Sequence, residues 1–235
     1  MKQFLPYYFL FFLLPASVIS QTVVSMKIDG SINPVSADFI RNGIEKARSE
    51  KAECLIIQLN TPGGLLKATR VIVSDMLQSP VPVIVYVSPG GSHAGSAGVF
   101  ITLAAHIAAM APGTNIGAAH PVMMQGQMDT TMNEKATNDA AAFIRTIAEK
   151  RHRNMVWAER AVRRSYSYSE TEALQDSVID LVVKNEEELL RMINGRIIEL
   201  SSGSKTLHTL SATIINYKMS IWEKILDIIS DPNIA

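Results

Sequence analysis

The sequence has little of what metal, redox and nucleic-acid-binding proteins need. Its 235 residues include one cysteine, Cys54, so an internal disulfide is excluded, and the apolar run after Cys54 predicts a buried core position. Five scattered histidines without HxxxH or CxxC spacing predict no metal site. The 22 basic residues balance the 22 acidic ones, which argues against nucleic acid as a partner. No dinucleotide-binding or Walker glycine pattern occurs either, so no cofactor is expected.

One long apolar block is present, at the N-terminus. Lys2 precedes an apolar run over residues 4–19, and Val18-Ile19-Ser20 leads into Gln21. This order predicts a secretory signal peptide over residues 1–20, with an uncleaved N-terminal anchor as the alternative. The run is shorter than the roughly 20 residues of a spanning helix. We therefore expect residues 21–235 to act outside the cytoplasm, secreted or attached to a membrane.

Apolar β-branched runs alternate with helical patterns along the rest of the chain. Continuous apolar strands between helices predict one α/β domain with a mostly parallel sheet covered on both faces. The expected strands are Thr22–Ile28, Leu55–Leu59, Pro82–Val87, Ile107–Ala111 and Val178–Val183. The expected helices are Asp38–Ser49, Leu65–Leu77, Gly95–His106, Thr131–Arg151 (with Thr131 as N-cap of a capping box), Glu170–Leu174 and Glu186–Ile193.

Two regions depart from this rhythm. Residues 112–130 are turn-rich and contain Met123, Met124 and Met128, which fits either an adaptable apolar surface beside a site or a mobile surface loop. Near the C-terminus, a small β element is expected from Ile197–Leu200, Thr206–Leu210 and Ala212–Tyr217. An amphipathic helix is expected over residues 220–229.

Two glycine-rich corners each follow a predicted strand. The first contains Gly63 and Gly64, and the second carries Ser96 between Gly95 and Ala97. Ligands bind at the carboxyl ends of strands in an open parallel sheet, so the two corners are expected side by side. The second corner makes Ser96 the candidate nucleophile, and the amides of Gly63, Gly64 and Ala97 are candidate donors to an oxyanion.

Two residues could take the proton of Ser96. Lys135 lies in the first turns of the long predicted helix, where the helix dipole disfavours its ammonium form, as a Ser-Lys dyad requires. His120 is the alternative base. The plainer interpretations are a solvated lysine and a loop histidine bonded to backbone. His93 is expected on a loop surface and His106 at a helix end.

Several stretches taken together resemble one protein family. They are Asn60–Gly64, Ala94–Gly98, Met110–Ala118 and Ser230–Ala235. In combination they resemble the NfeD family, membrane-bound serine proteases of the ClpP class related to signal peptide peptidase A. The resemblance covers nearly the whole chain after residue 20.

The resemblance implies a ClpP/crotonase-type fold and a Ser-Lys dyad. Ser96 matches the family nucleophile, Lys135 the family lysine, and Gly63 and Gly64 the oxyanion corner. It also implies hydrophobic, stomatin-like membrane-protein substrates and a homodimer or higher homo-oligomer. Long members continue past the terminal motif into transmembrane helices and a small β-barrel, so a truncated chain, a split gene or a separate membrane partner is expected here.

Two points leave alternatives open. Ser177 stands where the family often has glycine, which is expected to alter that turn slightly. His120 sits about where the wider class has a catalytic histidine, and Asp180 is then the candidate third member of a triad. Two other functions compete with a peptidase: a catalytically silent partner of membrane proteins, and a crotonase-type acyl-CoA enzyme.

Overall fold

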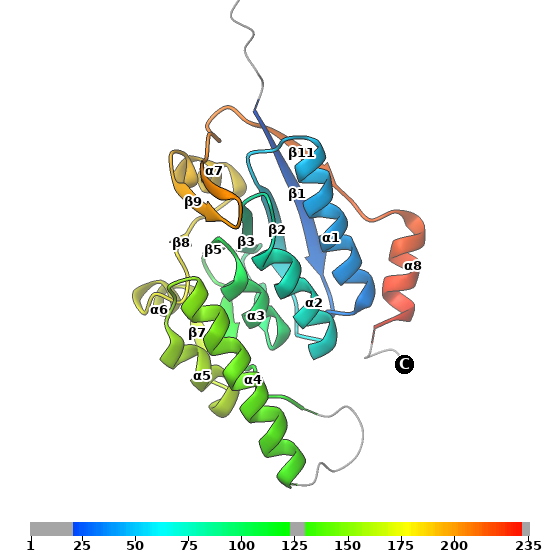
Figure 1. The fold of residues 1–235 in the computed structure, drawn as a ribbon, viewed down its shortest axis with the longest axis vertical. Helices are drawn as coiled ribbons and strands as arrows, with labels where there is room; N and C mark the ends of the chain where they lie inside the picture. Colours follow the sequence, from blue (N-terminus) through cyan, green and yellow to red (C-terminus); the bar gives the residue numbers. More distant parts are fainter. Residues whose placement is uncertain (1–20, 123–129, 232–235) are drawn as a thin grey trace, which may run out of the picture.

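A six-stranded sheet forms the centre of the structure, in the order β11-β1-β2-β3-β5-β8 (Figure 1). The computed structural model describes residues 21–122 and 130–231. Every neighbouring pair of strands in this sheet runs parallel, as the sequence predicts. The strands are β1 (Thr22–Asp29), β2 (Leu55–Asn60), β3 (Val83–Val87), β5 (Ile107–Met110), β8 (Leu181–Val182) and β11 (Thr213–Tyr217).

Both faces of the sheet are covered, so the central strands are buried on both sides. In β2, Ile57 joins a core with the helices of one face, while its neighbour Ile56 joins a second core on the opposite face. The first face carries α1 (Pro34–Ser49), α2 (Leu66–Leu77) and α3 (Ala97–Ala104). The second carries α7 (Glu186–Ile193) and the hairpin β9 (Ile197–Leu200) with β10 (Gly203–Thr206).

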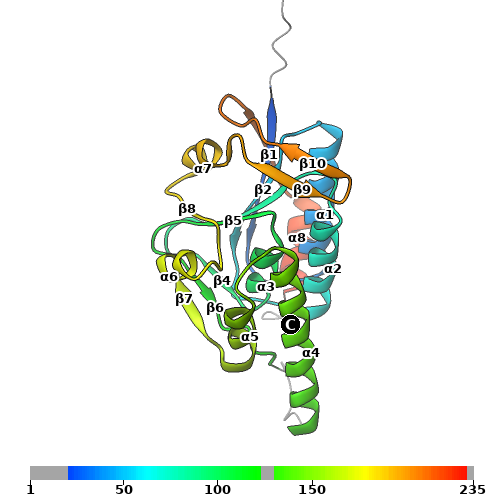
Figure 2. The same ribbon diagram turned by 60° about the vertical axis from the view of Figure 1, so that its left-hand side comes forward.

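An outer layer packs beyond the carboxyl ends of the central strands (Figure 2). A three-stranded sheet pairs β4 (His93–Gly95) in parallel with β6 (Asn115–Gly117), and β6 antiparallel with β7 (Ser167–Ser169). Around it lie α4 (Thr130–Lys150), α5 (Met155–Arg164) and α6 (Glu170–Gln175). The sequence predicted neither this small sheet nor α5.

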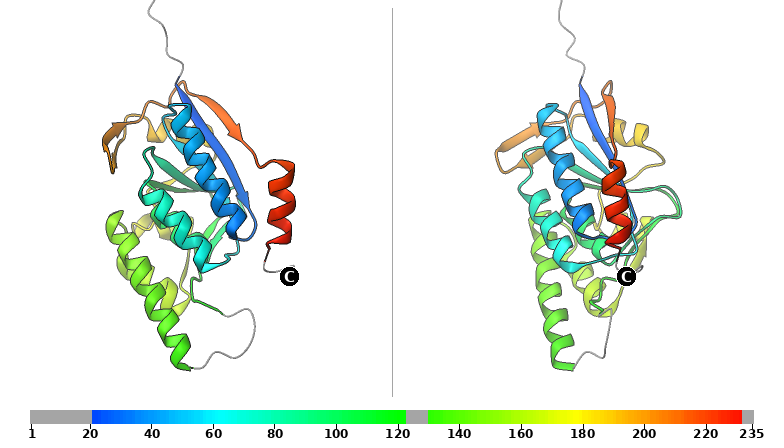
Figure 3. Two further views of the ribbon diagram at one scale, coloured as in Figure 1. Left: turned by 45° about the vertical axis from the view of Figure 1, so that its right-hand side comes forward. Right: turned by 90° about the vertical axis from the view of Figure 1, so that its right-hand side faces the viewer.

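The last helix, α8 (Ile221–Ile229), lies beside α1 at the β11 edge of the sheet (Figure 3). It confirms the amphipathic helix predicted over residues 220–229. Across residues 21–122 and 130–231, no helix is both long enough and apolar enough to cross a membrane. The predicted signal peptide and Met123, Met124 and Met128 lie outside the described residues.

The first helix begins earlier than predicted, at Pro34 rather than Asp38. Asn33 caps it: its Oδ1 accepts a 2.9 Å hydrogen bond from the amide of Ser36, and Ser36 Oγ accepts one from the amide of Asn33. Proline is favourable at the first helical position because its missing N–H needs no partner there. The residues Asn33-Pro34 therefore mark the start of α1.

Three other predicted boundaries were wrong. Gly95 belongs to β4, so the third helix starts at Ala97 and ends at Ala104. The fourth helix already includes Thr130, so Thr131 is a helical residue and not the N-cap.

The predicted C-terminal β element was also wrong as a unit. Thr213–Tyr217 joins the central sheet as the parallel neighbour of β1, away from the β9–β10 hairpin. The hairpin's second strand is Gly203–Thr206, where Thr206–Leu210 was expected, and β8 is limited to Leu181–Val182. The paired residues of β1 and β11 are 191 positions apart, so local sequence patterns cannot predict their pairing.

Candidate active site

The two glycine-rich corners lie side by side, as predicted. Thr61 pairs in parallel with Ala94: its amide donates to the carbonyl of His93 at 2.9 Å, and its carbonyl accepts from the amide of Gly95 at 2.9 Å. Because of this pairing, the first glycine-rich corner lies beside β4, the strand that precedes Ser96. The backbone of Gly63 consequently lies against the side chain of Ser96.

Ser96 has a strained backbone. Its φ of 48° and ψ of −106° are unusual for a residue with a side chain. The conformation is held from both sides: the Ser96 amide donates to the carbonyl of Gly117 at 3.0 Å, and the Ser96 carbonyl accepts from the amide of Val99 at 3.0 Å. Ser96 thereby stands on the sharp turn between β4 and α3, half-buried, at the positive end of the helix.

The three predicted oxyanion donors differ in availability. The amide of Gly63 donates to Oγ1 of Thr61 at 3.1 Å, so it is already engaged. The amide of Ala97 opens α3, where helix N–H groups lack partners within the helix. In the part of the chain that the structure describes, neither Gly64 nor Ala97 donates its amide to a protein acceptor.

A cavity of about 490 Å³ opens over Ser96, Gly64 and Ala97. Its wall is mostly apolar and is contributed by the first glycine corner, by α2 and α3, by residues 118–122, and by Ala140 of α4. The lining residues are Ser31, Pro62, Gly63, Gly64, Leu65, Leu66, Thr69, Ser96, Ala97, Phe100, Ala118, Ala119, His120, Pro121, Val122, Ala140 and Ser165. Such a cavity suits an extended apolar segment better than a charged ligand.

His120 lines this cavity together with Ser96. Its Nδ1 lies 3.0 Å from the carbonyl oxygen of Val162 on α5. An acceptor there requires a proton on Nδ1, and in the neutral ring Nε2 is then the acceptor. The histidine bonded to backbone that the sequence allowed is thus present, and it faces the cavity.

Lys135 lies on the second turn of α4 and is exposed. It is absent from the cavity wall, which the same helix reaches only with Ala140. In the described residues, Ser96 Oγ forms no hydrogen bond with Lys135 or His120. The structure therefore places Ser96, Gly63, Gly64, Ala97 and His120 together, with Lys135 outside the cavity wall.

Asp180 does not support His120. Its Oδ2 accepts from the guanidinium of Arg153 at 2.5 Å and from the amide of Ala108 at 2.6 Å, at the start of β5. The place beside His120 Nδ1 that a triad carboxylate would take is occupied by the Val162 carbonyl. The predicted role of Asp180 as third member of a triad was wrong, because the carboxylate neutralises a buried arginine instead.

The remaining candidate side chains have structural positions. Cys54 is fully buried, as predicted, and burial raises the pKa of its thiol far above the usual range. His106 follows the end of α3, as predicted; burial, and secondarily Arg151, lowers its pKa to about 3. His93 was expected on a loop surface, but it is a half-buried residue of β4.

Sequence reasoning missed the parts that hold the site in shape. Thr61 is fully buried, and its hydroxyl fixes Gly63. Helix α5 supplies the Val162 carbonyl to His120 and the Ala161 carbonyl to the amide of Ala119, at 2.9 Å. Of these residues, only Thr61 could have been singled out from the sequence, because it lies two positions before the glycine pair. Across the described ranges, no cluster of three or more histidine, cysteine, aspartate or glutamate side chains could hold a metal ion.

The chain has a ClpP-like fold. ClpP1 from Listeria monocytogenes matches it with a TM-score of 0.57 and 20% identity, covering 70% of this chain and 94% of that one. Residues 22–214 match the NfeD1b N-terminal domain, and the chain belongs to this family.

Two curated relatives are membrane proteins by name. Membrane-bound protease PH1510 of Pyrococcus horikoshii is 34% identical over 227 residues, which cover 94% of this chain and 52% of the relative. Membrane protein NfeD1b of Bacillus subtilis is 32% identical over 145 residues, covering 62% of this chain and 32% of the relative. The chain thus spans about half or less of the length of these relatives.

Solved structures give the same relationship. The 1510-N membrane-bound stomatin-specific protease, with a lysine replaced by alanine and in complex with a substrate peptide, matches with a TM-score of 0.84 and 33% identity. That match covers 91% of this chain and 100% of the other. A variant of the same protease with a serine replaced by alanine matches with a TM-score of 0.80 and 34% identity, covering 86% and 99%.

Proposed function

We propose that the chain is a serine endopeptidase domain in which Ser96 is the nucleophile. One observation carries the proposal: a strained serine precedes a helix in the wall of a mostly apolar cavity, beside two amides that donate to no acceptor among the described residues. Such strain persists only where the surrounding structure holds it in place, and it is common at catalytic serines. The protease relatives support the same reaction class.

The reaction follows from the placement of these groups. Ser96 Oγ attacks the carbonyl carbon of the scissile peptide bond while its proton passes to a base. The carbonyl oxygen becomes an oxyanion, which the amides of Gly64 and Ala97 stabilise. The protonated base then donates to the leaving amine, the C–N bond breaks, and water hydrolyses the acyl-Ser96 ester. Gly63 serves this arrangement by close packing on Ser96, with its own amide held by Thr61.

We assign the base to Lys135. It lies on the same helix as Ala140, one of the cavity-lining residues, and the solved relatives had a serine and a lysine replaced in separate variants. Contacts between a nucleophile and its base are often long in a free enzyme and shorten when substrate binds. His120, already in the cavity wall, is the competing base.

The substrates we propose are hydrophobic segments of membrane proteins. Apolar side chains such as Leu65, Phe100 and Val122 form the cavity wall, and the related Pyrococcus enzyme is described as specific for a stomatin homologue. We extend the proposal to a stomatin-like partner, a homodimer or larger homo-oligomer, and a position on the extracytoplasmic side of a membrane after loss of residues 1–20.

Covalent labelling tests the nucleophile. A fluorophosphonate probe is expected to label the wild-type chain at one site and to leave Ser96→Ala unlabelled. The matched control is Ser92→Ala, which removes a neighbouring buried hydroxyl outside the cavity wall and is expected to keep both labelling and peptide cleavage. Labelling that survives in Ser96→Ala contradicts the assignment.

Two single variants test the base. Lys135→Ala is expected to lower kcat for a hydrophobic peptide by at least about a hundredfold, as loss of a general base does. His120→Ala is expected to lower it far less, mainly through the lost hydrogen bond to Val162. The reverse result assigns the base to His120.

A catalytically silent partner is the second candidate function, favoured by the exposed position of Lys135. It predicts capture of a stomatin-like protein without cleavage, and wild-type binding by both Ser96→Ala and Lys135→Ala. Cleavage that both variants abolish rejects it.

A further inference from the structure

Helix α8 has its polar side toward the protein and its apolar side toward solvent. Its six apolar side chains are 41–76% exposed. They are Ile221, Trp222, Ile225, Leu226, Ile228 and Ile229. In contrast, its two acidic side chains, Glu223 and Asp227, are only half-exposed. At 100° per residue the apolar side chains occupy one continuous face.

The inward polar side is fastened to the turn before α1. Asp227 Oδ1 accepts a 2.8 Å hydrogen bond from Nδ2 of Asn33, and Asp231 Oδ1 accepts a 3.0 Å bond from Oγ of Ser31. The carboxylate of Glu223 accepts from the amide of Ser220 at 2.7 Å and caps the helix. The orientation of α8 is therefore fixed by specific bonds, and its apolar face is held outward.

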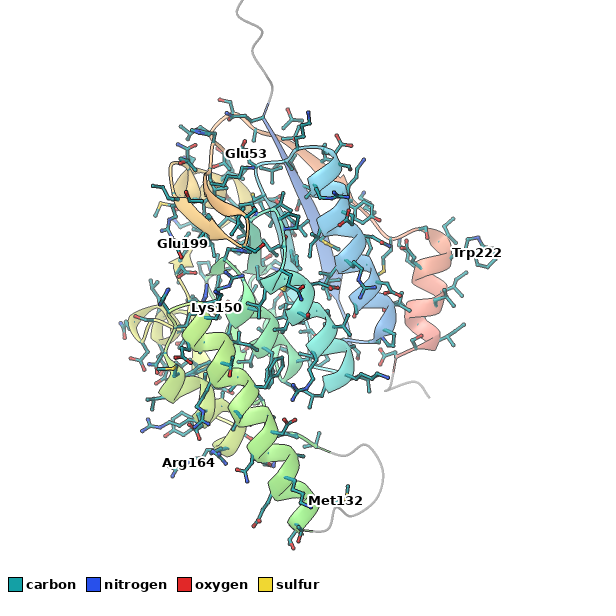
Figure 4. All side chains as sticks on the ribbon, viewed as in Figure 1. Glu53, Met132, Lys150, Arg164, Glu199 and Trp222 are labelled. Carbon is teal, nitrogen blue, oxygen red and sulfur yellow. The ribbon has the colours of Figure 1, made fainter. Side chains whose placement is uncertain are left out.

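The charged groups around α8 also favour contact with an anionic surface. The acidic groups of the helix and its end are all bonded to neutral donors of the protein. Lys218 and Lys224, which line a second cavity beside the helix, form no ion pair within residues 21–122 and 130–231. Trp222 projects away from the body of the molecule (Figure 4). An apolar face with an indole and unpaired lysines is typical of a helix lying in a lipid headgroup region.

We propose that the outward face of α8 docks onto the surface of a phospholipid bilayer. Nine residues are too few to span the roughly 20-residue apolar layer, so the helix lies along the surface. A second copy of the chain is the competing occupant, and the unpaired Lys218 and Lys224 beside the helix favour an anionic lipid surface over it. The proposal does not depend on Ser96 chemistry.

Tryptophan fluorescence of the full-length chain tests the contact directly. The chain has two tryptophans: Trp157 is 2% exposed and Trp222 is 75% exposed. Addition of mixed phosphatidylcholine and phosphatidylglycerol vesicles is expected to shift the emission to shorter wavelength, and lipids brominated on their acyl chains are expected to quench it. Because residues 1–20 contain no tryptophan, binding through that apolar segment alone gives neither signal.

Two matched variants locate the contact. Ile229→Asp adds a charge to the outward face of α8 at a side chain 68% exposed, and Ile197→Asp does the same on β9 at a side chain 69% exposed. Ile229→Asp is expected to lower the vesicle partition coefficient measured by quenching of Trp222 by at least about tenfold, since binding scales with buried apolar area. Ile197→Asp is expected to leave it within about twofold of wild type.

Three results overturn the proposal. Emission of Trp222 that vesicles leave unchanged shows that α8 does not meet lipid. Equal effects of Ile229→Asp and Ile197→Asp place any contact elsewhere. Sedimentation that shows a dimer lost in Ile229→Asp, without a vesicle response in wild type, assigns the face to a second copy. Far-ultraviolet circular dichroism and fluorophosphonate labelling at Ser96 confirm that each variant is folded, and failure of labelling alone affects only the peptidase proposal.

Discussion

A β-carbon added to Gly63 would lie 2.6 Å from Cβ of Ser96 and 3.1 Å from its Oγ. Real side chains do not approach so closely, so residue 63 has no room for anything larger than hydrogen. Gly63 also has a φ of 132°, a region that residues with a side chain rarely adopt. Position 63 thus carries two separate requirements for glycine, one from its backbone and one from Ser96.

Gly63→Ala separates these requirements when it is compared with Gly30→Ala. Gly30 has a similar φ of 146°, but an added β-carbon there meets no atom within 4 Å. Both variants are expected to lose about 1–2 kcal/mol of unfolding free energy through backbone strain. Only Gly63→Ala is expected to lose peptidase kcat, by about a hundredfold, because displacement of a nucleophile by about 1 Å has this effect.

Urea unfolding and peptide cleavage, measured on the same preparations, check this pair. Equal loss of kcat in both variants would contradict the close-contact explanation, since Gly30 lines the cavity beside α8 and not the cavity over Ser96.

Asp180 is predicted to act on stability and not on catalysis. Asp180→Asn keeps an oxygen for the amide of Ala108 but leaves the guanidinium of Arg153, whose side chain is 2% exposed, without a countercharge. Removing one partner of such a pair costs about 3–5 kcal/mol when both are buried; Asp180 is 34% exposed, so about 2–3 kcal/mol is expected. Below the unfolding transition, kcat is expected within about twofold of wild type.

The control for Asp180 is Asp38→Asn, which breaks an exposed pair with Arg41 and is expected to cost under about 0.5 kcal/mol. A fall in kcat of several orders of magnitude in Asp180→Asn, with stability unchanged, would restore the triad.

His106 makes the fold sensitive to acid. Its pKa in the folded protein is about 3, lowered by burial and then by Arg151 from the ordinary 6.5. Between pH 6.5 and 3 the unfolded chain binds a proton that the folded chain does not. The resulting stability is fully present above pH 6.5 and declines as the pH falls toward 3, by about 1.4 kcal/mol per pH unit at most.

His106→Asn is expected to remove that dependence, since its side-chain oxygen can still accept from the amide of Val83. Chemical unfolding from pH 7 to pH 4 measures the slope in both proteins. Parallel curves would show that other groups cause the acid sensitivity.

Ser177 supplies a stabilising substitution. Its φ is 56°, in the left-handed region, which fits the glycine expected there from the family resemblance. Serine at this position bears the strain of a left-handed backbone. Ser177→Gly is expected to raise the free energy of unfolding by about 0.5–1 kcal/mol, the strain relieved less the entropy that glycine loses.

Thermal unfolding compares Ser177→Gly with Ser169→Ala. Ser169 caps α6 at an ordinary φ of −67°, so its loss is expected to lower stability by about 1 kcal/mol. A melting temperature that falls in both variants would show that the Ser177 hydroxyl has a role in the turn.

The sequence was most informative where a local pattern decides the structure. Leu55–Leu59 is apolar without interruption because it is buried on both faces, and that pattern alone predicts a central parallel strand. Glycine pairs after two such strands were enough to bring Gly63 and Ser96 to one edge. The nucleophile's place followed from strand order and turn chemistry.

Other features depend on contacts between distant segments. β11 pairs with β1, and Val162 meets His120 only because α5 packs under residues 118–120. The hydrogen bond from the Gly63 amide to Thr61 could not be predicted from the residue types either. Lys135 is the clearest example. The sequence predicts that it lies near the start of a helix, but not which way its side of the helix faces.

The buried thiol of Cys54 makes the chain a convenient starting point for site-directed labelling. It is the single cysteine of the sequence, and burial suppresses the thiolate that maleimides and methanethiosulfonates attack. A cysteine introduced on α8 or near the cavity would therefore react alone, without prior removal of the native one. Spin labels placed in this way can report immersion depth and subunit distances on an otherwise unmodified protein.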